Sequence, residues 1–258
     1  MFSGITILFL IALWALGFLV DLAVDYISPE MEAIIFSPVN VTASELNEPG
    51  GSQEVELQRL LDGLQKCGRT NYPLKVFIKV RDDVNAMAMP GGRIYVFSGL
   101  LNNVKSENGL SFVLAHELGH FKNRDHLRGM GRRIVFTALT AFLSGAESKL
   151  TQLFASATDF TQAQYSQKQE EMADQLALKI LSCYYGHVGG ANEIFEAMKP
   201  KEKGQIIGRY FSTHPQSMKR IENLQRLTTS LNLVVKEVLP LPEALKIKET
   251  DRVNIARP

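Results

Sequence analysis

The feature that most constrains this 258-residue chain is a pair of histidines four residues apart, His116 and His120, with Glu117 directly after the first. In an α-helix, residues four apart lie one above the other on the same face, so both imidazoles can reach one metal ion. The glutamate between them projects beside that ion, as the H-E-x-x-H pattern requires. We therefore predict one zinc ion per chain, with His116 and His120 as ligands. Glu117 is the predicted general base that takes a proton from water and passes it to the leaving amine.

A hydrolytic zinc site also needs a third protein ligand and an open fourth position for water. Glu170 supplies this ligand best, because it lies near the start of a predicted helix over residues 166–185, with Asp174 one turn further on the same face. Glu171 points about 100° away around that helix, which makes it the fallback ligand. Since a metal-binding histidine usually donates its other ring N–H to a carboxylate, we expect Asp174 to orient one of the histidines.

Apolar periodicity elsewhere predicts an α+β fold that is mainly helical, with a small sheet over the helix that carries the histidines. The predicted helices cover residues 54–65, 166–185, 192–198 and 216–227, and the histidine helix begins after an N-cap at Ser106. The predicted extended segments cover residues 74–80, 85–89 and 93–97, with a Pro-Gly-Gly turn between the last two.

The N-terminus carries a mainly apolar run over residues 2–20 that no charged residue interrupts, roughly the length that crosses a bilayer. A retained single-pass anchor is favoured, because no Lys or Arg precedes the run and the run exceeds the usual core of a signal peptide. Cleavage of residues 1–22 as a signal sequence, giving a secreted protein, is the alternative. Acidic residues after the run favour an exported, periplasmic domain. The remaining organisation is a linker over residues 23–51, a zinc metallopeptidase domain over 52–232 and a peripheral tail over 233–258.

Charge and cysteine content limit the partners. The chain has 28 basic and 27 acidic side chains, which gives no reason to expect nucleic acid as a partner. The two cysteines, Cys67 and Cys183, either pair in an oxidising compartment or remain free thiols.

Four segments occur in the order seen in one known family: residues 85–101, His116-Glu-Leu-Gly-His120, Glu170-Glu-Met-Ala-Asp174 and Ser212-Thr-His-Pro215. Together they resemble the membrane-associated zinc metallopeptidases of the HtpX-like and CAAX-prenyl-protease group. The resemblance implies a zincin-like fold of the gluzincin type, with zinc ligands at His116, His120 and Glu170 and a base at Glu117. It also implies endopeptidase activity on unfolded or misassembled membrane or envelope proteins, as part of quality control.

The same resemblance suggests roles for two further parts of the chain. One segment is similar to an active-site edge strand, to which an extended peptide could add: Asn85, Ala86, Met87, Ala88 and Met89. An ordinary hairpin is the alternative. His214 lies in a loop that comes close to the metal in relatives, where it could be catalytic by stabilising the oxyanion, or could occupy the open zinc position and keep the enzyme latent. A histidine that merely caps the following helix is the alternative.

Two neighbouring features and one alternative function stay open at this point. Arg220 either pairs with an active-site acid or is an exposed helical arginine, and Asp125-His126 is expected to be a structural cap. The alternative to an enzyme is a zinc-stabilised holdase or scaffold that binds unfolded segments without cleaving them. The intact Glu117 argues against this alternative.

Overall fold

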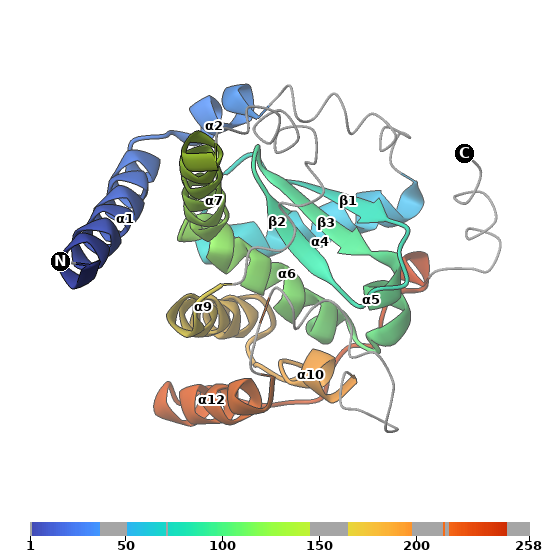
Figure 1. The fold of residues 1–258 in the computed structure, drawn as a ribbon. Coiled ribbons are helices and arrows are strands. Elements are labelled where there is room, and N and C mark those ends of the chain that lie inside the picture. The colour runs from blue at the N-terminus through green and yellow to red at the C-terminus, as the bar shows by residue number, and fades with distance from the viewer. Residues whose placement is uncertain are drawn as a thin grey trace.

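Helices surround a small sheet in the structure, a computed structural model that describes residues 2–36, 51–70, 72–144, 165–197, 214 and 217–246 (Figure 1). The helical elements are α1 (Phe2–Asp25), α2 (Pro29–Ile35), α4 (Ser52–Gly68), α5 (Ser98–Asn103), α6 (Glu107–Lys122), α7 (Asp125–Ser144), α9 (Gln167–Tyr185), α10 (Glu193–Ala197), α12 (Ser217–Ser230) and the 3-10 turn η3 (Glu243–Leu245). The strands are β1 (Lys75–Lys79), β2 (Ala86–Met89) and β3 (Arg93–Phe97). This is the mainly helical fold with a small sheet that the sequence predicts.

The three strands form one sheet in the order β1-β3-β2, with β1 parallel and β2 antiparallel to β3. The β2–β3 hairpin turns through Gly91 and Gly92, whose φ angles of 84° and 77° lie in the left-handed region that favours glycine. Within the described chain, no other strand pairs with the outer edge of β2. The hairpin is therefore fixed on one side by β3 and leaves an edge strand on the other.

Helix α6 runs between the sheet and α9, so its histidine-bearing turns lie inside the domain (Figure 1). It begins where predicted, because the Ser106 Oγ accepts a hydrogen bond from the Gly109 N–H at 2.9 Å. Helices α6 and α9 approach closely at Gly119, where an added Cβ would lie only 2.7 Å from the Ala173 Cα. Small residues at this crossing therefore allow α9 to bring its acidic face to α6.

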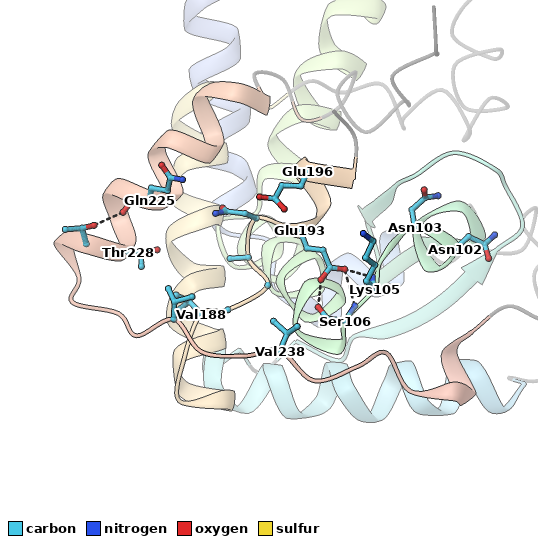
Figure 2. Close-up of a pocket in the computed structure, with 16 residues that line it drawn as sticks. Asn102, Asn103, Lys105, Ser106, Val188, Glu193, Glu196, Gln225, Thr228 and Val238 are labelled. Carbon is cyan, nitrogen blue, oxygen red and sulfur yellow. Dashed lines mark hydrogen bonds between the residues drawn. The ribbon is translucent and has the colours of Figure 1, made fainter. Parts of the chain in front are cut away.

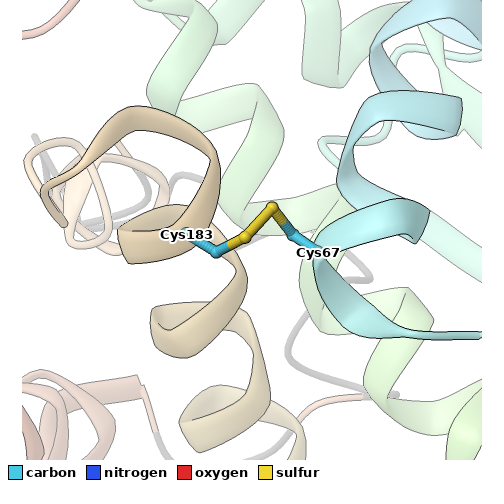
Figure 3. Close-up of a disulfide and its surroundings, with 2 residues drawn as sticks. All are labelled: Cys67 and Cys183. Atoms are coloured by element: carbon cyan, nitrogen blue, oxygen red, sulfur yellow. A yellow bond between two sulfur atoms is a disulfide. The ribbon is translucent and has the colours of Figure 1, made fainter.

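A disulfide between Cys67 and Cys183 joins the C-terminal ends of α4 and α9 (Figure 3). The Cα atoms are 5.8 Å apart, although the two cysteines are separated by 116 residues in the sequence. Of the two alternatives that the sequence leaves open, the structure therefore has the paired one. The bond ties the helix that carries Glu170 and Asp174 to the helix that covers the sheet.

Removal of this disulfide is expected to destabilise the domain. Because the bond closes a long loop, the Cys67→Ser, Cys183→Ser double variant should lose about 2–5 kcal/mol of unfolding free energy. Denaturant titration followed by circular dichroism measures this loss, and wild-type protein treated with a reductant should shift to the same midpoint. Equal midpoints for oxidised wild type and the double variant would contradict the expectation.

The segment before the domain differs from the irregular linker that we predict for residues 23–51. Helix α2 forms within it, with the Ser28 Oγ accepting a hydrogen bond from the Met31 N–H at 3.2 Å. Pro29 occupies the first turn of this helix, where proline is favoured. Glu32 on this helix is fully buried. The linker prediction is therefore wrong for α2, while residues 37–50 lie outside the described residues.

The segment after the domain also departs from its prediction as a peripheral tail over residues 233–258. Leu241 and Leu245 are buried in the main core, and η3 packs against α4. Pro240 forms an isolated β-bridge with Ser106, which places this segment beside the start of α6. Pro240 and Pro242 restrict the backbone to extended conformations, which favours the observed path of this segment along the domain. Residues 234–240 are exposed, as a peripheral segment would be, so the tail prediction is wrong only where Leu241 and Leu245 enter the core. Residues 247–258 lie outside the described chain.

Helix α1 lies beside α7 at one side of the molecule (Figure 1). Val24 of α1 packs on Leu127 and Met130 of α7, and Asp25 and Asp21 form ion pairs with Arg128 and Arg132. In the described part of the chain, no single helix has the length and apolar character needed to cross a membrane. By length and composition alone, the pair Ile11–Asp25 and Pro29–Ile35, bent by 111°, satisfies the requirement. The single span over residues 2–20 thus stays a prediction.

Candidate metal centre

Four buried side chains lie close enough to hold one metal ion: His116 and His120 from α6, Glu170 from the first turn of α9, and His214 from the segment before α12. Each offers one ligand atom, and these atoms all lie within 4.8 Å of one another. The Nε2 atoms of the two α6 histidines are 3.0 Å apart, and each lies 3.5 Å from a carboxylate oxygen of Glu170. The structure thus brings together the three residues that the sequence predicts as ligands, with His214, which the family resemblance suggests lies near the metal.

The chemistry of these donors fits a cation. His116 Nδ1 lies 2.9 Å from Asp174 Oδ1, and His120 Nδ1 lies 2.9 Å from Asp125 Oδ2. When the imidazoles are neutral and each donates its Nδ1–H to the neighbouring carboxylate, both Nε2 atoms present lone pairs to the centre. Two lone pairs and a carboxylate converging in the protein interior repel one another unless a positive ion lies between them.

Electrostatics around His120 also favour positive charge at the centre. Burial lowers the pKa of this imidazole, but the hydrogen bonds to Asp125 and Glu170 outweigh burial and raise the pKa to about 9. Burial likewise raises the pKa of Glu170, yet the charges of His214 and Arg220 hold that pKa well below its ordinary value. Glu170 is therefore ionised at neutral pH, as a metal-binding carboxylate must be.

The two carboxylates that orient the histidines come from different helices. Asp174 lies one turn after Glu170 on α9, as predicted from helical spacing. Asp125 begins α7, and the interpretation of Asp125-His126 as only a structural cap misses its contact with His120. Gln169 fixes Asp125 from the other side, because its Nε2 donates to Asp125 Oδ1 at 2.7 Å. The sequence does show a carboxylate shortly after the second histidine. That this carboxylate contacts His120 becomes visible only in the structure, where the turn between α6 and α7 folds it back.

Arg220 is buried and pairs with two of the acidic groups, which resolves the alternatives left open by the sequence. One guanidinium nitrogen lies 2.6 Å from Glu170 Oε2, and Nε donates to Asp174 Oδ2 at 3.0 Å. The guanidinium also lies over the Phe195 ring, 4.7 Å from its centroid. Burial raises the pKa of Asp174, but Arg220 outweighs this effect and lowers it. Arg220 thus offsets the negative charge of α9 beside His116, whose Nδ1 lies 3.2 Å from a guanidinium nitrogen.

Glu117 and His214 face one another next to the cluster. Glu117 is fully buried, and neither of its carboxylate oxygens has a hydrogen-bond partner in the described part of the chain. Its Oε1 lies 3.5 Å from His214 Nε2. His214 Nδ1 lies 2.9 Å from Glu170 Oε1 and 3.3 Å from His116 Nε2. His214 is therefore part of the centre in this structure and is not merely a helix cap.

Tyr165 is a further neighbour of the centre that sequence reasoning missed. Its ring stacks on the His120 imidazole with the centroids 3.8 Å apart and the planes 14° from parallel. The His214 ring lies 5.3 Å away from it. A tyrosine just before the N-cap of α9 carries no sequence signal for this contact, because the contact depends on how α9 meets α6.

The predicted substrate segment lies on the sheet beside α6. Ala86 and Ala88 of β2 are buried, whereas Met87 and Met89 are half-buried on the alternate face. Asn85 directly precedes the strand and is buried, and its carbonyl accepts a hydrogen bond from the Phe97 N–H at 3.0 Å. Since β2 contacts α6 and has a free edge within the described residues, the segment has the placement that strand addition needs.

A separate cavity of about 890 Å³ lies at the N-terminal end of α6 and is lined by none of the metal-cluster residues (Figure 2). Glu193 points into the α6 N-terminus there, and its carboxylate accepts hydrogen bonds from Ser106 and from the Lys105 N–H. A carboxylate at a helix N-terminus offsets the positive end of the helix dipole. Glu193 therefore has a structural role at the start of α6.

A buried H-E-x-x-H helix, a carboxylate from a neighbouring helix and carboxylates behind both histidines define the chain as a zinc metallopeptidase domain. The chain belongs to peptidase family M48, whose family profile matches residues 52–228. Metallopeptidases of this family use zinc, and the His-His-Glu-His donor set suits that ion.

Three relatives illustrate the family. The chain is 34% identical over 154 residues to the mitochondrial metalloendopeptidase OMA1 of Schizosaccharomyces pombe, covering 57% of this chain and 44% of the relative. It is 28% identical to metalloprotease YcaL of Escherichia coli, covering 59% of this chain and 61% of the relative. It is 27% identical to metalloprotease LoiP of Escherichia coli, covering 59% of this chain and 62% of the relative. The chain therefore spans less than two thirds of the length of these relatives.

Proposed function

We propose that this chain is a zinc-dependent endopeptidase that cleaves polypeptide chains with His116, His120 and Glu170 as zinc ligands. One observation carries the proposal: three donor side chains converge beside the Glu117 carboxylate, which is buried without a hydrogen-bond partner in the described chain. A buried, unpartnered carboxylate is costly unless it serves chemistry at the site. Such an arrangement suits proton transfer during hydrolysis.

Each residue of the centre has a separate role in the proposed reaction. Zinc, when bound, polarises the scissile carbonyl and makes water a stronger acid. Glu117 accepts a proton from the attacking water and delivers it to the leaving amine. Asp174 and Asp125 keep the Nδ1 protons on His116 and His120, so that both Nε2 atoms remain donors to the metal. Arg220 keeps Glu170 and Asp174 ionised.

The proposed substrates are extended polypeptide segments from unfolded or misassembled membrane or envelope proteins. An extended segment would pair with the edge of β2, and the substrate-binding residues would be Asn85, Ala86, Met87, Ala88 and Met89. The names of the relatives, metalloendopeptidase and metalloprotease, support a polypeptide substrate. The free edge of β2 among the described residues supports the mode of binding.

The proposed location is the exported, periplasmic side of a membrane, with residues 2–20 as a single anchor. Large apolar side chains of α1 are exposed, among them Ile11, Trp14 and Phe18, and a bilayer would cover them. The Cys67–Cys183 disulfide supports an oxidising compartment. On this view the chain is a compact, singly anchored relative of the HtpX-like and CAAX-prenyl-protease enzymes. A secreted form after signal cleavage is the alternative that N-terminal sequencing distinguishes.

Removal of zinc tests the proposed activity. Detergent-purified full-length protein should cleave casein, and a chelator should abolish cleavage because the polarised carbonyl and activated water both depend on the ion. Restoring zinc after removal of the chelator should restore cleavage. Cleavage that persists in the chelator after bound metal has been shown to be gone would contradict the proposal.

His214 is proposed to occupy the fourth ligand position in this conformation and to leave it when a substrate binds. His214→Ala should therefore keep zinc and increase the initial rate of casein cleavage, since the closed position is opened. Metal analysis and progress curves measure the two effects. A lower kcat with zinc and KM unchanged would instead assign His214 to oxyanion stabilisation, which is the catalytic role suggested by the sequence.

A further inference from the structure

The fully buried carboxylate of Glu32 lies outside residues 52–228, the part matched by the family profile, yet it contacts three elements of the domain. Its Oε1 accepts hydrogen bonds from the Gly91 N–H at 2.8 Å and from His126 Nε2 at 3.0 Å. Its Oε2 accepts a hydrogen bond from the Tyr72 hydroxyl and lies 3.5 Å from an Arg124 guanidinium nitrogen. Glu32 of α2 thus accepts hydrogen bonds from the β2–β3 turn, from α7 and from the segment before β1.

The contact at Gly91 acts directly on the hairpin. Gly91 and Gly92 both have left-handed φ angles, a conformation that needs glycine, and the Gly91 N–H is directed to Glu32. Hydrogen bonds to an ionised carboxylate are stronger than those between neutral groups. Because β2 pairs only with β3 in the described chain, the position of this turn sets where the outer edge of β2 lies.

The other donors connect the same carboxylate to the end of the metal-binding helix. The rings of Tyr72 and His126 pack against Phe121, with centroid distances of 5.4 Å and 4.5 Å. Phe121 directly follows His120 on α6. Glu32 therefore lies between the β2–β3 turn and the C-terminal end of α6, where it can hold the two at a fixed separation.

We propose that Glu32 is a positioning residue that fixes the substrate-binding edge of β2 relative to the metal centre. The proposal rests on the function proposed above and on peptide binding at β2. Helix α2 follows α1 after three residues, so the same contact ties the substrate edge to the N-terminal helix. Peptides would then be presented at a fixed distance from that helix.

The test compares full-length Glu32→Ala and Glu32→Gln with wild type. On an extended peptide substrate, Glu32→Ala should raise KM by roughly tenfold, the scale set by loss of one buried hydrogen-bond partner, with kcat and zinc content unchanged. Amide hydrogen exchange at Gly91 should be faster in Glu32→Ala, while exchange within α6 stays as in wild type. Glu32→Gln keeps one acceptor oxygen for Gly91 and should give an intermediate KM. It also serves as the test variant if Glu32→Ala does not fold.

Tyr72→Phe is the matched control, because it removes one donor to Glu32 but leaves the Glu32–Gly91 hydrogen bond in place. The phenylalanine ring still packs on Phe121, and His126 still connects Glu32 to that end of α6, so KM and Gly91 exchange should equal those of wild type. Wild-type KM and wild-type Gly91 exchange in the folded Glu32 variants would overturn the proposal even though the enzyme cleaves peptides. A fall in kcat together with zinc loss would also overturn it, because Glu32 would then support the metal centre. Absence of cleavage by wild type would instead refute the proposed function itself.

Discussion

Glu170→Ala is expected to lose zinc and all measurable casein cleavage, whereas Glu171→Ala is expected to keep both. The two carboxylates are neighbours on α9, but only Glu170 points into the cluster, 3.5 Å from both histidine Nε2 atoms. Glu171 lies on the outside of the helix in an exposed ion pair with Arg226. Exposed pairs of this kind contribute little to stability, so Glu171→Ala changes charge and length without disturbing the fold.

Metal analysis after exhaustive dialysis against metal-free buffer measures the difference between these variants. Circular dichroism of both proteins controls for folding, since Glu170→Ala also leaves Arg220 with one acidic partner fewer. Zinc retained in Glu170→Ala and lost in Glu171→Ala would show that the third ligand is the other carboxylate. Zinc retained equally in both would place the ligand outside this turn of α9.

Glu117→Gln is expected to lower casein cleavage by about 10²–10⁴-fold while zinc stays bound. Glutamine has nearly the shape of glutamate but cannot accept the proton from water. Both Glu117 oxygens lack hydrogen-bond partners in the described chain, so the substitution breaks no hydrogen bond there, and the one polar neighbour it affects is His214, 3.5 Å from Oε1. Steady-state kinetics with parallel zinc analysis measures the effect, and wild-type protein purified in the same way is the control.

The same substitution separates an enzyme from a binding protein. A zinc-stabilised holdase that recognises unfolded segments through β2 would bind casein without cleaving it, and Glu117→Gln would change nothing. Equal, negligible cleavage by wild type and Glu117→Gln, with zinc present in both and with His214 replaced, would contradict the peptidase. A clear difference between the two would contradict the holdase.

Local patterns were sufficient for the parts of the site that lie on regular helices. The spacing of His116 and His120 and the single turn between Glu170 and Asp174 follow from 3.6 residues per turn. The N-cap at Ser106 and the Pro-Gly-Gly turn have short-range signals, and the structure has both features. The predicted helices and strands therefore resemble the observed ones wherever the hydrophobic periodicity and the capping residues indicate the same element.

Contacts between segments distant in sequence could not be predicted in the same way. Asp125 reaches His120 only because the chain turns back between α6 and α7, and Tyr165 stacks on His120 because of the angle between α6 and α9. The linker and tail predictions also fail where a proline leads into ordered structure. Pro29 starts a helix, and Pro240 directs the following chain into the core rather than away from it. Glu32 lay in the predicted linker, where a buried acid was not expected.

The most direct measurement of the proposed centre is a zinc-edge anomalous difference map from crystals of the zinc-loaded protein. We expect one peak per chain, about 2.0–2.2 Å from His116 Nε2, His120 Nε2 and a carboxylate oxygen of Glu170, with Glu117 beside it and not bound to it. A peak coordinated by other side chains, or no peak at this cluster in protein that contains zinc, would contradict the account.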